Sequence, residues 1–131
     1  MFGRKAQPPI KSLIAHGTRI EGDLKFTEGL RVDGEVAGNI SANSEQSSIL
    51  VVSESAVVTG EIRADHIIIN GQVNGPIYAG VMLELQPKAR IVGDVHYTAL
   101  EMHQGATISG QLRPSLAGEP KPTLKLAANN E

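Results

Sequence analysis

A five-residue pattern of aliphatic and polar positions occurs six times along the chain. It reads aliphatic, spacer, glycine, polar, aliphatic, and its copies are centred on Gly22, Gly34, Gly60, Gly71, Gly93 and Gly110. Within one copy, Ile20-Glu21-Gly22-Asp23-Leu24, the alternation has a period of two, which is typical of a strand with one buried face. We therefore expect Ile20, Gly22 and Leu24 to point inward and Glu21 and Asp23 to face solvent. A glycine pointing inward in mid-strand would let the wall bend there.

The copies also repeat at a longer distance. Residues Arg31–Ala42 align without a gap with Ile68–Ala79, at an offset of 37 residues. A second family, with offsets of 33 and then 17, covers Leu50–Ile62, Leu83–Val95 and Leu100–Leu112, and Ile14–Leu24 is a degenerate fourth copy. The shortest offset predicts one winding of about 17 residues, and the longer offsets then span two windings. Neighbouring copies 11 or 12 residues apart indicate three faces for each winding, each a strand of about five residues.

A repeat this short cannot bury its own apolar face and must stack on its neighbours. The sequence therefore predicts an all-β fold, a parallel β-helix of about six windings. A β-sandwich also has short strands and turn glycines, but it does not explain a gapless self-similarity of twelve residues. Insertions at 43–48 and 79–81 break the strict six-residue period of left-handed β-helices, which favours the right-handed form.

Composition divides the chain of 131 residues into three zones. Residues 13–113 contain the repeats and form the expected polymerisation domain. Residues 1–12 and 114–131 are rich in proline and lack the periodicity, so we expect two flexible tails.

Charge and residue usage exclude several classes of function. The chain has no Cys and no Trp, and its formal net charge is −2, so neither thiolate chemistry nor general nucleic-acid binding is expected. No apolar run approaches the length of a transmembrane helix, and the first residues lack the apolar stretch of a secretory signal. We therefore expect a soluble cytoplasmic protein.

Candidate catalytic residues are few. The four histidines, one of which could act as a general base by analogy with β-helical acyltransferases, are His16, His66, His96 and His103. None lies in a convincing catalytic or metal-binding pattern, so we expect surface or turn positions. The repeat carboxylates are Glu21, Asp23, Asp33, Glu35, Glu61 and Asp94, and we expect them to keep the sides of the rod soluble and to discourage lateral pairing between rods. No phosphate loop or dinucleotide motif is present, so no enzyme activity, cofactor or metal is expected.

Three segments, in this order, resemble the bactofilin family of bacterial cytoskeletal proteins. They are Ile14–Leu24, which reads Ile-Ala-His-Gly-Thr-Arg-Ile-Glu-Gly-Asp-Leu, then Leu30–Val36 and Ile68–Val73. The resemblance extends over nearly the whole chain, and its specificity comes from the ordered set, not from any one motif. It implies a right-handed β-helix that assembles end to end into filaments without nucleotide. It also implies a scaffolding role in cell shape, cell-wall synthesis or polar localisation.

The two ends of a stacked fold are its expected working surfaces. The first and last windings each lack a neighbour on one side, and such edges are either covered or used. The expected contact residues are Leu13, Ile14, Ile20, Leu24 and Phe26 at the first end, and Leu100, Met102, Ile108 and Leu112 at the other. Pairing of like ends would give a filament without polarity, which the resemblance favours, and head-to-tail pairing would give a polar one.

The first residues are a candidate membrane contact. Met1, Phe2, Arg4 and Lys5 place one aromatic ring beside two cations, a combination that favours an anionic bilayer surface. One such tail binds weakly, but a filament presents many of them. We expect this protein's partners to be other copies of itself, the inner face of the cytoplasmic membrane and cell-wall enzymes.

Two other functions remain open on the sequence alone. One is a β-helical acyltransferase subunit, whose site would lie between neighbouring subunits. The other is a monomeric binding solenoid, which would need capped ends. A weaker signal lies in the C-terminal tail, where Leu124, Leu126, Lys121 and Lys125 could recruit a partner.

Overall fold

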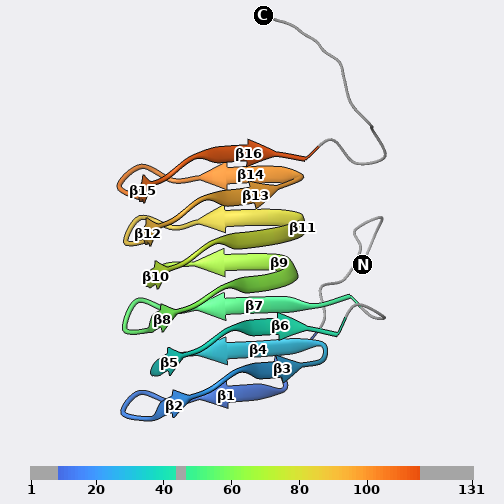
Figure 1. The fold of residues 1–131 in the computed structure, drawn as a ribbon, viewed down its shortest axis with the longest axis vertical. Coiled ribbons are helices and arrows are strands. Elements are labelled where there is room, and N and C mark those ends of the chain that lie inside the picture. The colour runs from blue at the N-terminus through green and yellow to red at the C-terminus, as the bar shows by residue number, and fades with distance from the viewer. Residues whose placement is uncertain (1–8, 44–46, 116–131) are drawn as a thin grey trace, which may run out of the picture.

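The protein is a rod of short parallel strands. The computed structural model describes residues 9–43 and 47–115, and in this part of the chain every regular element is a strand (Figure 1). The strands are β1 (Ser12–Ile14), β2 (Arg19–Glu21), β3 (Leu24–Phe26), β4 (Gly29–Val32), β5 (Glu35–Ala37), β6 (Ile40–Ala42), β7 (Ile49–Val52), β8 (Val57–Thr59), β9 (Ile62–Ile69), β10 (Gln72–Asn74), β11 (Ile77–Leu85), β12 (Arg90–Val92), β13 (Val95–Tyr97), β14 (Ala99–Met102), β15 (Thr107–Ser109) and β16 (Leu112–Pro114).

The strands form six windings with three faces each. The first face stacks β1, β4, β7, the end of β9, the end of β11 and β14. The second face stacks β2, β5, β8, β10, β12 and β15. The third face stacks β3, β6, the start of β9, the start of β11, β13 and β16. The predicted number of windings and of faces is confirmed.

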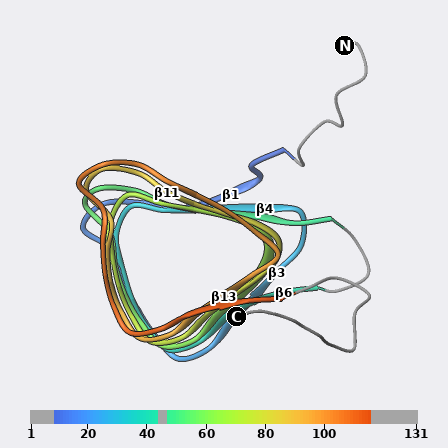
Figure 2. The ribbon, with the colours of Figure 1, turned by 90° about the horizontal axis from the view of Figure 1, so that it is seen from above.

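The cross-section is triangular, and the helix is right-handed (Figure 2). Seen from above, the chain runs counterclockwise from β1 to β3, and Figure 1 shows it rising toward that viewer. A chain that turns counterclockwise as it approaches the viewer follows a right-handed helix. The predicted fold, a right-handed parallel β-helix, is therefore confirmed.

Aliphatic columns fill the interior. On the second face the register joins Val36, Val58, Val73 and Ile91 in successive windings, and each is at most 1% exposed. Parallel stacking places equivalent positions of neighbouring windings about 4.8 Å apart, so each residue covers the one before it. Such a column needs branched aliphatic residues of similar size, which explains why none of the described residues that are fully buried is aromatic.

The long-range offsets of the sequence are the registers of these columns. Val32 pairs with Val52 and Val52 with Ile69, so residues 37 apart lie two windings apart. On the same face Leu83 pairs with Leu100, an offset of 17 residues and a single winding. The interpretation of the 37-residue and 17-residue offsets is confirmed.

The position of the repeat glycines differs from the prediction. Gly22 lies between β2 and β3, and Gly34 lies between β4 and β5, so neither points inward from mid-strand. The five-residue pattern straddles a corner and contributes two strands of three or four residues, where one of about five was expected. The aliphatic residues at both ends of the pattern still point inward, because each lies on a different face.

The two sequence families correspond to two different corners. Gly34 and Gly71 lie between the first and second faces. A column of glycines between the second and third faces consists of Gly22, Gly38, Gly60, Gly75, Gly93 and Gly110. At Gly60, where φ is +150°, an added Cβ would lie 2.1 Å from the carbonyl oxygen of Gly38. Successive windings therefore approach so closely at this corner that a side chain has no room.

The two insertions are accommodated at the corner between the third and first faces. The first insertion lies between β6 and β7, and a hydrogen-bonded pair anchors its end. The backbone N–H of Asp65 donates to the Ser48 hydroxyl at 3.0 Å, and the Ser48 N–H donates back to the Asp65 carboxylate at 3.3 Å. The second insertion is a bulge in β11, where the register with β9 shifts between Ala79 and Met82.

Candidate functional site

Both ends of the rod present open strand edges. Among the described residues, β1, β2 and β3 each pair only with the strand of the second winding. At the other end β14, β15 and β16 each pair only with the strand of the fifth winding. Each terminal winding therefore has one row of backbone N–H and C=O groups without a strand partner, which is a template for adding another strand.

At the first end, apolar side chains lie partly uncovered. Ile20, Leu24 and Phe26 are half-buried and pack on the core, and Ile14 is 7% exposed. Leu13 differs from the other expected contact residues, because it points away from the core and is 58% exposed. It therefore lies on the side of the first winding and not over the apolar columns.

At the second end two apolar side chains of the last winding are exposed. Leu100 and Ile108 are half-buried, whereas Met102 is 45% and Leu112 is 48% exposed. Val95, which lies one winding below Leu112 in the same column, is fully buried. The exposure of these side chains thus comes from the absence of a seventh winding, not from a change in the pattern.

Two arginines of the terminal windings form ion pairs within the subunit. At the first end the Arg19 guanidinium lies 3.0 Å from Glu21 and 2.9 Å from Glu35, and hydrogen bonds to these carboxylates raise the pKa of Arg19. At the second end Arg113 lies 3.2 Å from Asp94. Both guanidinium groups therefore have carboxylate partners without a second subunit.

Some of the repeat carboxylates and amides have a structural role that the sequence alone did not reveal. Directly after the corner glycine, Asp23 accepts a hydrogen bond from the backbone N–H of Asn39 at 3.0 Å. The Asn39 side chain in turn accepts from the N–H of Glu61 at 2.9 Å. These residues form a ladder between windings. The sequence signal for this ladder is the polar residue that follows each corner glycine. We had expected that residue only to face solvent.

The other expected surface carboxylates lie on the outside as predicted. Asp33 receives hydrogen bonds from Ser53 and from Arg31, which lower the pKa of Asp33, with the serine as the larger cause. Glu61 forms an ion pair with Arg63. These carboxylates therefore take part in the charge pairing of the outer surface.

The four histidines lie apart from one another. His16 is exposed on the turn after β1, and His66 lies at the corner within β9. The His96 ring stacks on Tyr78 with 4.3 Å between ring centroids. His103 lies 3.2 Å from Glu84 and 3.3 Å from Glu101. Among the described residues, only His103 lies within ion-pair distance of two carboxylates.

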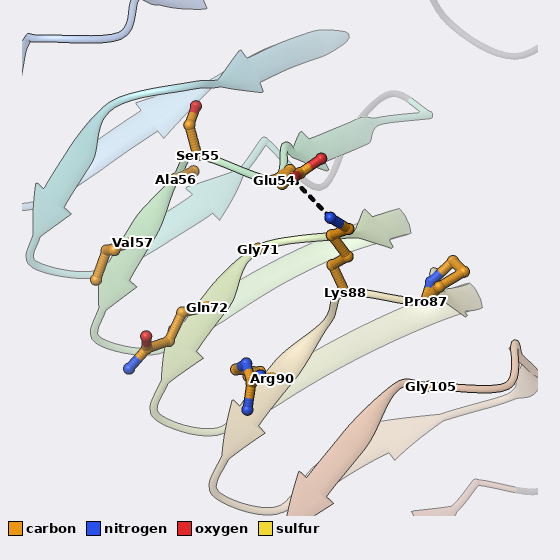
Figure 3. A pocket seen from close by; sticks show the side chains of 10 residues that line it. All are labelled: Glu54, Ser55, Ala56, Val57, Gly71, Gln72, Pro87, Lys88, Arg90 and Gly105. Carbon is orange, nitrogen blue, oxygen red and sulfur yellow. Dashed lines mark ion pairs between the residues drawn. The ribbon is translucent and has the colours of Figure 1, made fainter.

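An open groove runs along the corner between the first and second faces (Figure 3). The ion pair between Lys88 and Glu54, at 3.1 Å, joins windings five and three across it. Ala56, Gln72 and Arg90 also line it, and no histidine is among the described lining residues. Within the described part of the chain the guanidinium of Arg90 has no carboxylate partner, so the groove offers hydrogen-bonding groups and a cation.

The membrane-contact prediction lies outside the described residues. Met1, Phe2, Arg4 and Lys5 precede them, and the C-terminal tail residues from 116 onward follow them. Across residues 9–43 and 47–115 no helix is long and apolar enough to cross a bilayer.

Comparisons with known proteins agree with this architecture. Residues 12–113 match the model of a family described as Bactofilin, polymer-forming cytoskeletal. The chain is 30% identical to Bactofilin BacO of Myxococcus xanthus strain DK1622 over 111 residues, which are 85% of each chain. It is 32% identical over 101 residues to Bactofilin BacP of the same strain, covering 77% of this chain and 40% of that one. No solved structure matches.

Proposed function

Because the chain belongs to the bactofilin family of polymer-forming cytoskeletal proteins, we propose that its two uncovered ends join copies end to end into filaments. The single observation that carries this proposal is that each end of the rod has both an open strand edge and apolar columns that no further winding covers. Adding a subunit would supply the missing strand to each edge and cover Met102 and Leu112.

Burial of apolar surface is the driving force of this assembly. A fully covered aliphatic side chain contributes about 1.5–3 kcal/mol relative to an exposed one. Each end presents several such side chains, and the interface also gains backbone hydrogen bonds along three strands. The proposed filament needs no nucleotide, because none of its contacts depends on a bound phosphate.

A charge placed at the end of a column tests the filament. The variant Leu112→Lys should abolish filaments in negative-stain electron micrographs, because a lysine in the dry interface costs several kilocalories per mole. Val92→Lys is the matched control, since Val92 is 54% exposed but lies on the side of the fifth winding. It should assemble like the unchanged protein.

Two results would contradict the proposal. Filaments of normal length in Leu112→Lys would remove the second end from the interface, and loss of filaments in both variants would indicate a general effect of charge. Circular dichroism of each variant verifies that the fold persists. The same pair of measurements with Ile20→Lys examines the first end.

We also propose that the filament lies in the cytoplasm against the inner face of the membrane. The support is the sequence of the first residues, where Phe2 stands beside Arg4 and Lys5. Each cation near an anionic leaflet contributes about 1 kcal/mol, and a filament multiplies this weak contact.

Flotation with anionic liposomes tests the membrane contact. Filaments of a variant that lacks residues 1–7 should stay at the bottom of the gradient. Filaments of a variant that lacks residues 121–131 should float with the liposomes, like those of the full chain. Equal flotation of both deletions would refute the contact. The scaffold role that we propose, organising cell-wall enzymes and cell shape, rests on both properties together.

A further inference from the structure

Three potential metal ligands converge near the second end, on the outside of the first face. They are Glu84 on β11, Glu101 on β14, and His103, which directly follows β14. The Nε2 atom of His103 lies 3.2 Å from a carboxylate oxygen of Glu84 and 3.3 Å from one of Glu101. The ligating atoms of all three residues lie within 4.8 Å of one another.

The backbone stacking enforces this convergence. Glu84 and Glu101 are directly paired in the register of β11 and β14. His103 follows Glu101 by two residues, and its N–H donates to the Leu85 carbonyl at 2.8 Å, which continues the same register. Side chains two residues apart on a strand share a face, so the imidazole must lie beside both carboxylates.

The two glutamates of this cluster differ from most described carboxylates in having no Lys or Arg partner. The carboxylates that form ion pairs with Lys or Arg are Glu21, Glu28, Asp33, Glu35, Glu54, Glu61 and Asp94. Within the described part of the chain neither Glu84 nor Glu101 has a Lys or Arg partner, and the imidazole of His103 lies within ion-pair distance of both. Two carboxylates directly opposite each other repel. With a neutral imidazole the cluster carries two uncompensated negative charges.

We propose that Glu84, Glu101 and His103 bind one divalent cation of the zinc type. Zn²⁺ lies about 2.0–2.2 Å from each nitrogen or oxygen ligand atom. In tetrahedral geometry two such ligand atoms are about 3.4 Å from each other. This separation matches the distances between His103 and the two glutamates. The ion would neutralise both carboxylates and leave a fourth position for water.

A neighbouring amide supports one ligand from behind. The side-chain nitrogen of Gln86 donates to the same carboxylate oxygen of Glu84 at 3.4 Å. Hydrogen bonds of this kind orient metal ligands and raise affinity. The donor set of one imidazole and two carboxylates suits Zn²⁺ better than Mg²⁺, which prefers oxygen ligands alone.

The bound ion would join the fifth winding to the sixth. Only the sixth winding has an open edge at this end, so the ion would hold that edge in the strand conformation that a second copy must meet. This consequence rests on the proposed function, but binding of the ion does not.

Calorimetric titration of the untagged, chelator-treated full chain with ZnCl₂ tests the site. We expect one equivalent to bind, and the midpoint of thermal unfolding to rise with it. Glu84→Gln and Glu101→Gln keep the shape of the side chain and should each weaken binding by about tenfold or more. Co²⁺ as a second probe should give the visible absorption of a tetrahedral site, which the same variants should lose.

Two control variants separate this site from adventitious binding. His96→Gln removes an imidazole that stacks on Tyr78, and Glu54→Gln removes a carboxylate paired with Lys88. Both should bind Zn²⁺ like the unchanged chain. The proposal is overturned if the full chain binds no equivalent, or if the controls weaken binding as much as the Glu84 and Glu101 variants. Either result would leave the filament proposal intact, because filaments are scored separately by microscopy.

Discussion

The carboxylate of Asp94 accepts a hydrogen bond from the backbone N–H of Gln111 at 2.9 Å, and this contact fastens the sixth winding to the fifth. The Nε atom of Arg113 approaches the other oxygen of the same carboxylate at 3.2 Å. The backbone hydrogen bond and then the guanidinium hold the pKa of Asp94 below its usual value. The attachment of the sixth winding to the fifth therefore depends in part on the ionised carboxylate of Asp94.

This link predicts a pH dependence of stability. A carboxyl whose pKa is lowered by folding stabilises the protein above its unfolded pKa of about 3.9, and the effect is lost as pH falls through the folded pKa. Asp94→Ala should therefore unfold at lower urea concentration than the unchanged chain at pH 7. The gap between the two should shrink as pH falls below about 4.

Urea unfolding followed by circular dichroism, at a fixed protein concentration, measures this gap. Asp23→Ala serves as a comparison from the first end, where the carboxylate caps Asn39 without an arginine. A gap for Asp94→Ala that stays constant from pH 7 to pH 3 would contradict the assigned role of the charged carboxylate.

The glycine corner makes a second prediction. A Cβ at Gly60 would meet the backbone carbonyl of Gly38, and neither can move without separating two windings. Gly60→Ala should cost about 3 kcal/mol in the free energy of unfolding, the upper end of the usual range for overpacking. Gly80→Ala is the control, because its Cβ would lie 3.1 Å from the end of the Asp65 side chain, a contact that a shift of that side chain by a few tenths of an ångström would relieve.

Thermal unfolding of both variants measures the two losses of stability. Gly80→Ala should stay within about 1 kcal/mol of the unchanged protein, as substitutions on tolerant surfaces do. If Gly60→Ala were equally mild, the close approach of windings at this corner would not be a requirement of the fold.

The buried hydroxyl of Ser48 makes a third prediction. This side chain is 1% exposed and accepts from the N–H of Asp65. Ser48→Ala would leave that N–H without its acceptor, at a cost of about 1–3 kcal/mol. Ser47→Ala changes the exposed neighbour and should have little effect. A similar unfolding midpoint for the two variants would show that the Ser48 hydroxyl contributes nothing.

The second-face column makes a fourth prediction. Ile91 and Ile108 are paired in register, but Ile91 is 1% exposed and Ile108 is half-buried at the end. Ile91→Ala should cost about 2–5 kcal/mol, as cavities in tight cores do. Ile108→Ala should cost less in unfolding, and its larger effect should fall on assembly.

Sedimentation of assembled protein, measured beside urea unfolding, separates the two effects. Ile91→Ala should mainly lower the free energy of unfolding, and the protein that remains folded should still assemble. Ile108→Ala should mainly reduce assembly and have a smaller effect on the free energy of unfolding. The reverse result for Ile108 would mean that the second end is not an interface.

Much of this architecture could be predicted from the sequence because the fold is nearly one-dimensional. Each winding contacts only its neighbours, so the register that pairs Val32 with Val52 and Ile69 appears directly as a sequence offset. The alternation that turns Ile20 inward and Glu21 outward was equally accessible, since it depends only on the period of a strand.

The corners of the β-helix were harder to predict from the sequence. A glycine that follows an aliphatic residue and a spacer has the same local pattern whether it lies in mid-strand or at a bend. The position of Gly60 is decided by the carbonyl of Gly38, which lies in another winding. For the same reason the role of Asn39, which accepts from Glu61, could not be read from its local sequence.

The sequence by itself determined the stacked fold, the number of windings and the residues of the apolar columns, because these follow from periodicity. Only the tertiary structure decided which polar side chains meet. Glu84, Glu101 and His103 come together because two registers and one corner set their positions, and a distance between side chains on different windings depends on the path of the whole chain between them.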